Sequence, residues 1–409
     1  MAMRGEFAAI PLGAWYVLGV ATIALQRIGI PVVAKSLPIV ALLLVLVLGA
    51  CAAKGISRVR DLRLVGYAMT VAFATGMTIV LGGSPTSLLL LALLWIPYMF
   101  LGPPGSSNEF LRGVLHSTLA ACAFGALQSL VSAAGGGFMD PVSQLPKALL
   151  VPGFNTTYAV QYGSSWMKAN GGVFLEPSLL SLFGGLALVL LVEGSLQLPR
   201  WCPRPLAILV AGAGVASSVA VSALVLAPAL LIALFTLARR SWVMILETLV
   251  LIAILGLLPQ AQPFLDRALA GEGTSNSARL INPYSILLPR AMGESPIVGL
   301  GAGASRIAVE SLELGGGSQR DWQADVTTPT IVKTGYEFGL IGWVLLAAAL
   351  ITLWRRSPQS IASKAAIFSM YLIPTDGLSS ALLTPLILIS SGEVREPPGR
   401  TTPSGADDE

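Results

Sequence analysis

Long apolar stretches, separated by short polar segments, recur along the whole chain. Most are about 20 residues long, which is enough for an α-helix to cross a hydrocarbon core of roughly 30 Å. Lipid offers the backbone no hydrogen-bond partner, so such stretches must satisfy their own N–H and C=O groups as helices. The pattern predicts an all-α polytopic membrane protein with about 11 spans, within a range of roughly 10–12. The predicted spans are residues 9–26, 31–53, 64–82, 85–102, 112–134, 173–194, 204–220, 221–238, 242–259, 331–354 and 363–390.

Two of these boundaries need interpretation. Residues 204–238 form one apolar run that is too long for a single helix, and we divide it near Ser217, Ser218 and Ser222. The last span contains prolines, which interrupt helices. We therefore expect 363–390 to be a broken helix or a re-entrant pair.

The distribution of basic residues predicts the orientation. Short loops rich in Lys and Arg stay in the cytoplasm, and alternation of the spans places these loops on one side. The two long loops, about 135–172 and 260–330, then lie on the outer face. Arg27 and Lys35 also fall outside, against the rule. The inner basic residues are Lys54, Arg58, Arg60, Arg63, Arg200, Arg204, Arg239, Arg240, Arg355, Arg356 and Lys364.

Composition agrees with a membrane protein. The chain has 409 residues, of which 54% are hydrophobic and 11% charged, whereas soluble domains carry about 25% charged residues. We predict one membrane domain, residues 1–390, in which the first span is no removable signal peptide, and a disordered polar tail, residues 391–409. The net charge of +4 is no argument for nucleic-acid binding. Cys51, Cys122 and Cys202 show no metal-ligand spacing and are interpreted as buried or interfacial thiols.

The first long loop ends in a conspicuous sequence, "KANGGVFLEPSLLSLF". Lys168 closes the loop, and Glu176 stands in the first turn of the next helix, where Pro177 is tolerated. The glycines before the helix allow a tight turn. A lysine, a turn and an acid thus converge near the outer boundary of the membrane. An acid that matches the helix dipole is the simpler interpretation of Glu176.

The second long loop carries arginines, the residues best suited to clamp phosphate through paired donors. They are Arg267, Arg279, Arg290 and Arg306. The alternative is ordinary loop charge, or ion pairs with Glu272, Glu294 and Glu310. The stretch "GLGAG" in this loop lacks the Lys-Ser/Thr and the strand context of a nucleotide-binding loop.

The span after this loop opens with "TTPTIVKTGYEFGLIG". Lys333 and Glu337 are four residues apart and share a helix face, so they can simply form an ion pair. His116, the only histidine, is interpreted as a buried, hydrogen-bonded side chain. The sequence contains no metal-ligand cluster and no Ser-His-Asp set on the outer face, so we predict no metal and no cofactor.

Three stretches together resemble the O-antigen polymerase/ligase superfamily, and its polysaccharide-polymerase branch most. They are "NGGVFLEPSLLSLF", "SARLINPYSILLPRAMGESPIVGLGAG" and "KTGYEFGLIG", in the order that the superfamily shows. The resemblance covers roughly 165–345. In the ligase branch a histidine usually stands near the end of the second loop. Here that region reads "QADVTTPTIVK", without a histidine, and the usual arginine before the first motif is Lys168.

The resemblance implies a multi-span glycosyltransferase of the bacterial inner membrane, which makes O-antigen or exopolysaccharide from polyprenyl-diphosphate-linked sugars at the outer face. Its partners would be the glycan donor and acceptor, with a chain-length regulator and a flippase as further candidates. Cations at the outer boundary would hold the diphosphate as it leaves. These are Arg279 and Lys168 first, then Arg267, Arg290, Arg306 and Lys333. Glu176 would be the general base, with Glu337 the second candidate.

Two alternatives remain. One is a ligase that transfers glycan to a lipid, wall or protein acceptor. The other is a transporter or flippase of lipid-linked sugars, a class that places ionisable residues in mid-bilayer. In this sequence Glu247 is the main charge that falls centrally in a predicted span. The depth of the charges therefore favours the enzyme.

Overall fold

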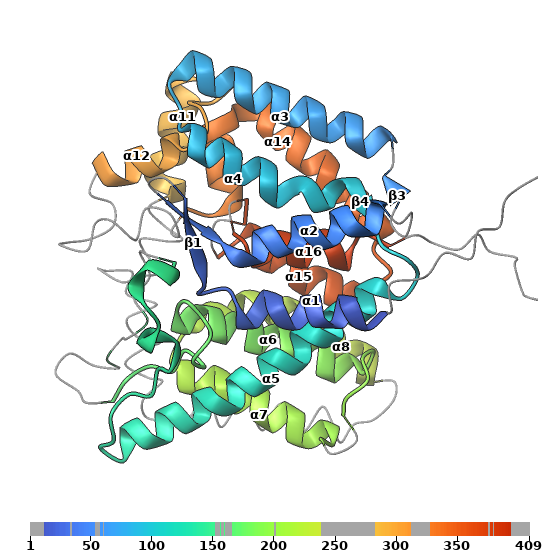
Figure 1. Cartoon of the computed structure of the whole chain (residues 1–409), viewed down its shortest axis with the longest axis vertical. Coiled ribbons are helices and arrows are strands. Elements are labelled where there is room, and N and C mark those ends of the chain that lie inside the picture. Colours follow the sequence, from blue (N-terminus) through green and yellow to red (C-terminus); the bar gives the residue numbers. More distant parts are fainter. Residues whose placement is uncertain are drawn as a thin grey trace, which may run out of the picture.

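The computed structural model shows a mostly helical chain (Figure 1). Three helices are long and apolar enough to cross a membrane, judged by length and composition, within residues 62–81, 106–133 and 330–356. The structure describes residues 12–32, 35–53, 58–59, 61–151, 156, 159, 166–199, 202–238, 283–311, 328–374, 377–378 and 380–393.

Most of the described helices fall within the predicted apolar windows, whereas α11 and α12 lie in the predicted second long loop. The predicted span 242–259 lies outside the described residues, and the tail does so from residue 394. The helices are α1 (Leu12–Ala24), α2 (Ile39–Ala53), α3 (Asp61–Leu81), α4 (Pro85–Trp95), α5 (Ser106–Ala133), α6 (Pro177–Glu193), α7 (Arg204–Ser218), α8 (Ala227–Ala238), α11 (Leu288–Glu294), α12 (Ala304–Ser311), α14 (Thr330–Arg356), α15 (Ile361–Leu372) and α16 (Leu383–Ser390). Short helical turns are η1 (Ile96–Met99), η2 (Val142–Gln144), η3 (Lys147–Leu149), η4 (Val221–Leu226) and η6 (Pro283–Leu287).

Both uncertain boundaries are now resolved. The run 204–238 is divided where the serines suggested, because α7 ends at Ser218 and Val219 adopts a left-handed conformation. The last window is broken into α15 and α16.

The prediction of an all-α fold is wrong in one detail, because short strands occur at two places. Strands β1 (Gly29–Val32) and β2 (Lys35–Pro38) form an antiparallel hairpin where a helix was expected to begin at residue 31. Prolines at the start and end of this hairpin lack the N–H group that a helix interior needs, so α2 begins only after Pro38. Strands β3 (Arg58–Val59) and β4 (Phe100–Leu101) form a second pair.

The core lies around α6, which is buried on all sides between α5, α7, α8 and α15. A helix that is hydrophobic all round belongs in such a position. Glycines let α1 and α5 approach closely: a Cβ on Gly19 would lie 2.1 Å from the Phe110 oxygen, and one on Gly113 would lie 2.1 Å from the Tyr16 oxygen. Small residues at helix contacts are typical of membrane bundles.

Helix α14 is broken at Gly339, which has φ 59° and ψ −154°. The loop before α12 fills the break with backbone hydrogen bonds. Leu300 N and Gly301 N donate to the carbonyls of Tyr336 and Glu337, each over 2.9 Å. On the other side of the break, Leu340 N and Ile341 N donate to Pro296 O and Ile297 O over 2.9 and 3.1 Å. The "PIVGLGAG" and "EFGLIG" stretches therefore form one unit.

The close backbone contacts at Gly339 predict the effect of adding a single methyl group at this position. In Gly339→Ala the new Cβ would lie 2.5 Å from the Ile297 carbonyl, at a positive φ that alanine disfavours. Residues forced into such backbone conformations cost about 1–3 kcal/mol. We expect a lower thermal unfolding temperature for the detergent-solubilised variant. Gly66→Ala is the matched control, because a Cβ there meets no atom within 4 Å and alanine favours the helix. Equal melting of the two variants would contradict this account of the break.

Candidate functional site

The turn before α6 depends on glycine for both conformation and space. Gly171 and Gly172 have φ of 65° and 73°. A Cβ on Gly171 would lie 2.7 Å from the Ala121 oxygen, and one on Gly172 would lie 2.8 Å from the ring of Phe124. Only glycine adopts these angles without strain and leaves room for α5. The Asn170–Gly172 turn is thereby pressed against α5.

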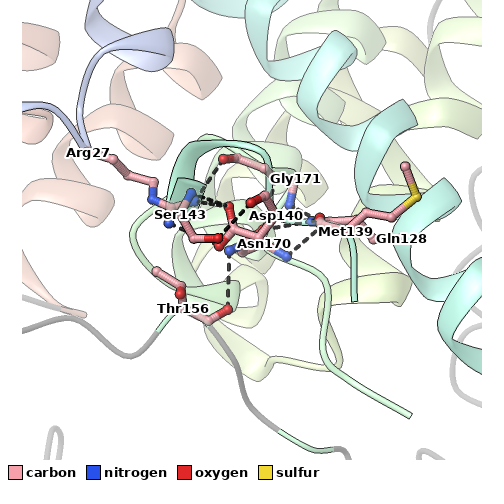
Figure 2. Close-up of polar contacts among 9 residues, drawn as sticks. Arg27, Gln128, Met139, Asp140, Ser143, Thr156, Asn170 and Gly171 are labelled. Carbon is pink, nitrogen blue, oxygen red and sulfur yellow. Dashed lines mark hydrogen bonds and ion pairs between the residues drawn. The ribbon is translucent and has the colours of Figure 1, made fainter. Parts of the chain in front are cut away.

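Gln128 of α5 holds this turn through both ends of its side-chain amide (Figure 2). Its Oε1 accepts hydrogen bonds from Asn170 N and Gly171 N, over 3.2 and 2.9 Å. Its Nε2 donates to Asn170 Oδ1 over 3.0 Å and to Met139 O over 2.6 Å. Asn170 Oδ1 also accepts from Gly172 N at 2.8 Å. A fully connected buried network of this kind fixes one geometry.

A buried ion pair ties the same turn to the end of α1. Arg27 and Asp140 each have a side chain that is 4% exposed. The guanidinium binds the carboxylate through Nη1–Oδ1 at 2.6 Å and Nη2–Oδ2 at 3.0 Å (Figure 2). Nη1 also donates to Gly172 O over 2.8 Å. A buried charge needs such a partner, because desolvation is costly.

This pair explains the apparent exception to the charge rule. From the sequence, Arg27 was predicted to be a charged residue of an outer loop, which opposed the predicted orientation. In the structure Arg27 is a buried structural group neutralised by Asp140, whereas the rule concerns basic residues of short loops. The side chain of Lys35 lies outside the described residues.

Glu176 stands directly after this turn, and its side chain is buried, with 1% of the residue exposed. It is the N-cap of α6 rather than part of the first turn, with φ −145° and ψ 154°, and Pro177 is the first helical residue. Oε2 of Glu176 accepts a hydrogen bond from Ser178 Oγ over 2.9 Å. Lys168, on the other side of the turn, is half-buried. The predicted lysine, turn and acid thus occupy one short, anchored segment.

Glu337 forms the second candidate site. It precedes the break in α14 and is 2% exposed. Ser305 Oγ donates to Glu337 Oε1 over 2.5 Å. Ser305 lies in the first turn of α12. The loop before α12, residues 296–303, is the one that pairs with the break, and we call it the glycine loop. Lys333 lies one turn before Glu337 on α14, and Arg306 follows Ser305 on α12.

The other predicted cations divide into two groups. Arg290, on α11, forms an exposed i,i+4 ion pair with Glu294 over 2.7 Å, in which both side chains are more than 40% exposed. This agrees with the simpler alternative of a solvated ion pair. Arg267 and Arg279 lie outside the described residues, and the side chain of Arg306 does so too.

The predicted residues therefore gather in two groups, around Glu176 and around Glu337. The sequence analysis missed Gln128, Asp140 and Ser305. Nothing in local sequence marks Gln128, but the misplaced charge of Arg27 was a signal that a buried carboxylate should exist.

The remaining reactive side chains are structural. His116 is hydrogen-bonded at both ring nitrogens, to Tyr16 Oη at 3.1 Å and to Gln197 O at 3.2 Å. The sequence predicted a buried, hydrogen-bonded histidine, and the structure shows a half-buried, hydrogen-bonded one. Cys51, Cys122 and Cys202 are buried, in agreement with the prediction of buried or interfacial thiols.

No protein-family model matches this chain, and no curated protein is significantly similar to it.

The buried ion pair of Arg27 and Asp140 predicts that removal of one partner destabilises the protein much more than removal of both. Asp140→Asn leaves the Arg27 charge buried without its anionic partner, which should cost roughly 3–5 kcal/mol of folding stability. In the double variant Arg27→Met with Asp140→Leu no charge remains, so we expect most of that loss to be recovered. The measurement is the unfolding temperature of the purified protein in detergent.

The exposed pair on α11 provides the control. Glu294→Gln breaks a similar guanidinium–carboxylate contact in solvent, where ion pairs contribute about 0–1 kcal/mol. If Asp140→Asn melted as late as Glu294→Gln, the buried pair would not anchor the turn.

Proposed function

We propose that this protein is a membrane glycosyltransferase that polymerises polyprenyl-diphosphate-linked oligosaccharide units at the outer face of a bacterial inner membrane. One observation carries the proposal. Glu176, within the motif "NGGVFLEPS", is almost completely buried at the start of an apolar helix, on a turn fixed by Gln128 and Arg27. An ionisable residue retained in such surroundings indicates a functional site, because burial of its charge is costly.

The proposed reaction is the attack of a sugar hydroxyl on a lipid-linked sugar. The hydroxyl oxygen bonds to the anomeric carbon of the donor while the bond from that carbon to the diphosphate breaks. The diphosphate leaves with its polyprenyl chain. Glu176 accepts the hydroxyl proton in this scheme, and Glu337 is the alternative base.

Cations replace a metal in this scheme, because positive charge stabilises the departing diphosphate. Lys168 stands across the turn from Glu176, and Lys333 lies one turn from Glu337. Arg279, Arg267 and Arg306 are proposed for the same role on the basis of the sequence alone. Arg290 is the weakest candidate, because Glu294 already binds its guanidinium.

The arrangement of the described elements supports the proposed topology. The hairpin strand β1 and helices α11 and α12 lie at one end of the bundle, and β3, between the basic residues of the α2–α3 segment, lies at the other (Figure 1). We propose that the end with α11 and α12 faces outward, with about 11 spans in total.

A ligase reaction differs from polymerisation in its acceptor. The only histidine of the chain is bonded to Tyr16 and Gln197. The second loop therefore offers no histidine of the ligase type, and this favours the polymerase.

The break in α14 invites comparison with transporters, whose interrupted helices present free backbone groups to ions or substrates. In this protein the loop at residues 296–303 engages backbone groups on both sides of the break: the carbonyls of Tyr336 and Glu337, and the N–H groups of Leu340 and Ile341. The break supports a fixed carboxylate rather than an ion site. This observation favours the enzyme over the transporter.

Glu176→Gln tests the proposed base directly. The amide keeps the size of the side chain and its capacity to accept from Ser178, but it cannot take a proton. Loss of general-base catalysis should slow polymerisation roughly 100- to 10,000-fold. The measurement is the length distribution of surface polysaccharide on gels, with membrane-protein abundance determined in parallel.

Glu109→Gln is the matched control. Like Glu176, Glu109 is an acid at the start of a helix, but it lies in the first turn of α5 and is paired with Arg112 in a partly exposed ion pair. Removal of a helix-start acid should cost only about 0.3–1 kcal/mol, and polymer should remain normal. Normal polymer from Glu176→Gln at wild-type abundance would remove Glu176 from catalysis and leave Glu337 for the same test.

The orientation can be tested independently of catalysis. Gln144 and Ser195 are both exposed, one after α5 in the first long loop and the other between α6 and α7. The native cysteines are buried and should react little. In intact cells we expect an impermeant thiol reagent to label Gln144→Cys but not Ser195→Cys. The reverse pattern would invert the topology and exclude an outward-facing Glu176.

A further inference from the structure

A second feature, separate from the two carboxylates, is an apolar cavity of about 210 Å³ between α3, α4 and α14. Its walls include Tyr67, Ala74, Leu91, Trp95, Phe338 and Leu346. An apolar cavity of roughly 150 Å³ already binds benzene and stays dry. This cavity therefore has room for a segment of hydrocarbon chain.

Among the polar groups of the wall, the hydroxyls of Tyr67 and of three threonines are bonded to the protein, whereas Trp95 Nε1 is buried without a hydrogen-bond partner. Tyr67 Oη donates to Ala92 O over 2.6 Å. The lining threonines Thr70, Thr334 and Thr352 each donate to a carbonyl of their own helix. Hydroxyls already bonded in this way offer no donor to a polar ligand, so the lining selects hydrocarbon.

The cavity lies beside a helix that packs weakly on the protein. Ala74 is the only hydrophobic residue of α3 that is buried, while side chains such as Met69, Ile79 and Val80 are more than 60% exposed. Figure 1 shows α3 along the edge of the bundle, above α14 and α4. In a membrane such a face contacts lipid, so a lipid chain can reach the space between α3 and α14.

The cavity passes close to the second candidate site, although Glu337 and Ser305 are not among its lining residues. On α14 the lining runs from Thr334 to Thr352, across the break at Gly339. Phe338, a lining residue, directly follows Glu337 and packs with Ala74 and with Ala302 of the glycine loop. A chain that lies along α14 would place its head group beside the glycine loop, Ser305 and Glu337.

We propose that this cavity binds the polyprenyl chain of the lipid-linked donor, with the diphosphate at the Phe338 end. The inference rests on the proposed function, and it adds the position of the lipid chain and the site of the head group. A phospholipid acyl chain is the competing occupant, but it has no reason to end at a buried carboxylate and a glycine loop. The packing of the lining residue Phe338 on Ala302, beside the Glu337 site, therefore favours the donor.

The test compares two alanines of α14. Ala349 lines the cavity, whereas Ala347, two residues away, is exposed and does not line it. Ala349→Trp should fill the part of the cavity near Thr352, away from Phe338, and Ala347→Trp should not. The full-length purified protein is titrated with undecaprenyl diphosphate and with farnesyl diphosphate, whose short chain reaches only the Phe338 end.

We expect Ala349→Trp to weaken binding of undecaprenyl diphosphate roughly tenfold or more, because burial of two methylene groups contributes about that factor. Binding of farnesyl diphosphate should be unchanged, and Ala347→Trp should bind both probes as the wild type does. Undiminished binding of the long chain by Ala349→Trp would overturn the proposal. So would a co-purifying phospholipid that undecaprenyl diphosphate fails to displace.

A measurement on the unmodified chain guards against a variant that fails to fold. A polyprenyl diphosphate with a photoreactive group in its chain should label peptides from α3 and α14, and excess undecaprenyl diphosphate should prevent the labelling. Labelling confined to other helices would contradict the proposal. Binding is measured without turnover. If the chain binds as stated but Glu176→Gln still makes normal polymer, the proposed catalytic role fails and the cavity assignment stands.

Discussion

In an apolar bundle, backbone N–H and C=O groups that lie outside a regular helix need hydrogen-bond partners from other parts of the protein. Both candidate sites depend on this constraint. At Gly339 the helix stops for one residue, and the glycine loop provides donors before the break and acceptors after it. Before α6 the chain turns through two left-handed glycines, and the amide of Gln128 satisfies the turn. In each case the irregular backbone is fixed by its partners. The carboxylate next to it, Glu337 or Glu176, therefore has a defined position.

Buried charge imposes a second condition on the same region. Arg27 and Asp140 neutralise each other in a two-point contact, and the guanidinium also binds the glycine turn. The exposed pair of Arg290 and Glu294 has nearly the same separation but little consequence for stability, because water screens it. Similar residue types thus have different roles according to burial. For this reason Arg27, which the charge rule treats as an exception, supports the site more directly than Arg290 does.

The apolar cavity lies beside the second of the two sites, because its lining residue Phe338 directly follows Glu337 and packs with Ala302. Helix α3 leaves space against α14 instead of packing into it, and the hydroxyls in that space are bonded to backbone carbonyls. The same helix, α14, carries Glu337 at the break and the cavity wall beyond it. A substrate with a long hydrocarbon chain and a charged head group matches this order of features along one helix. The proposed enzyme and the proposed chain-binding cavity are linked through Phe338.

The apolar runs by themselves predicted a mostly helical chain and most of the described helices, because a run of about 20 apolar residues has few alternatives in lipid. They also marked the division at Ser218 and the interruption of the last window, and they singled out Glu176 through its glycine turn and proline. Contacts between distant residues could not be derived in this way. The partners Arg27 and Asp140 are separated by 113 positions, and Ser305 and Glu337 by 32. The hairpin of β1 and β2 and the break at Gly339 also escaped the hydropathy pattern, because each depends on which backbone groups meet in space. Only the tertiary structure decides which backbone groups come into contact, because these contacts arise from how the helices pack.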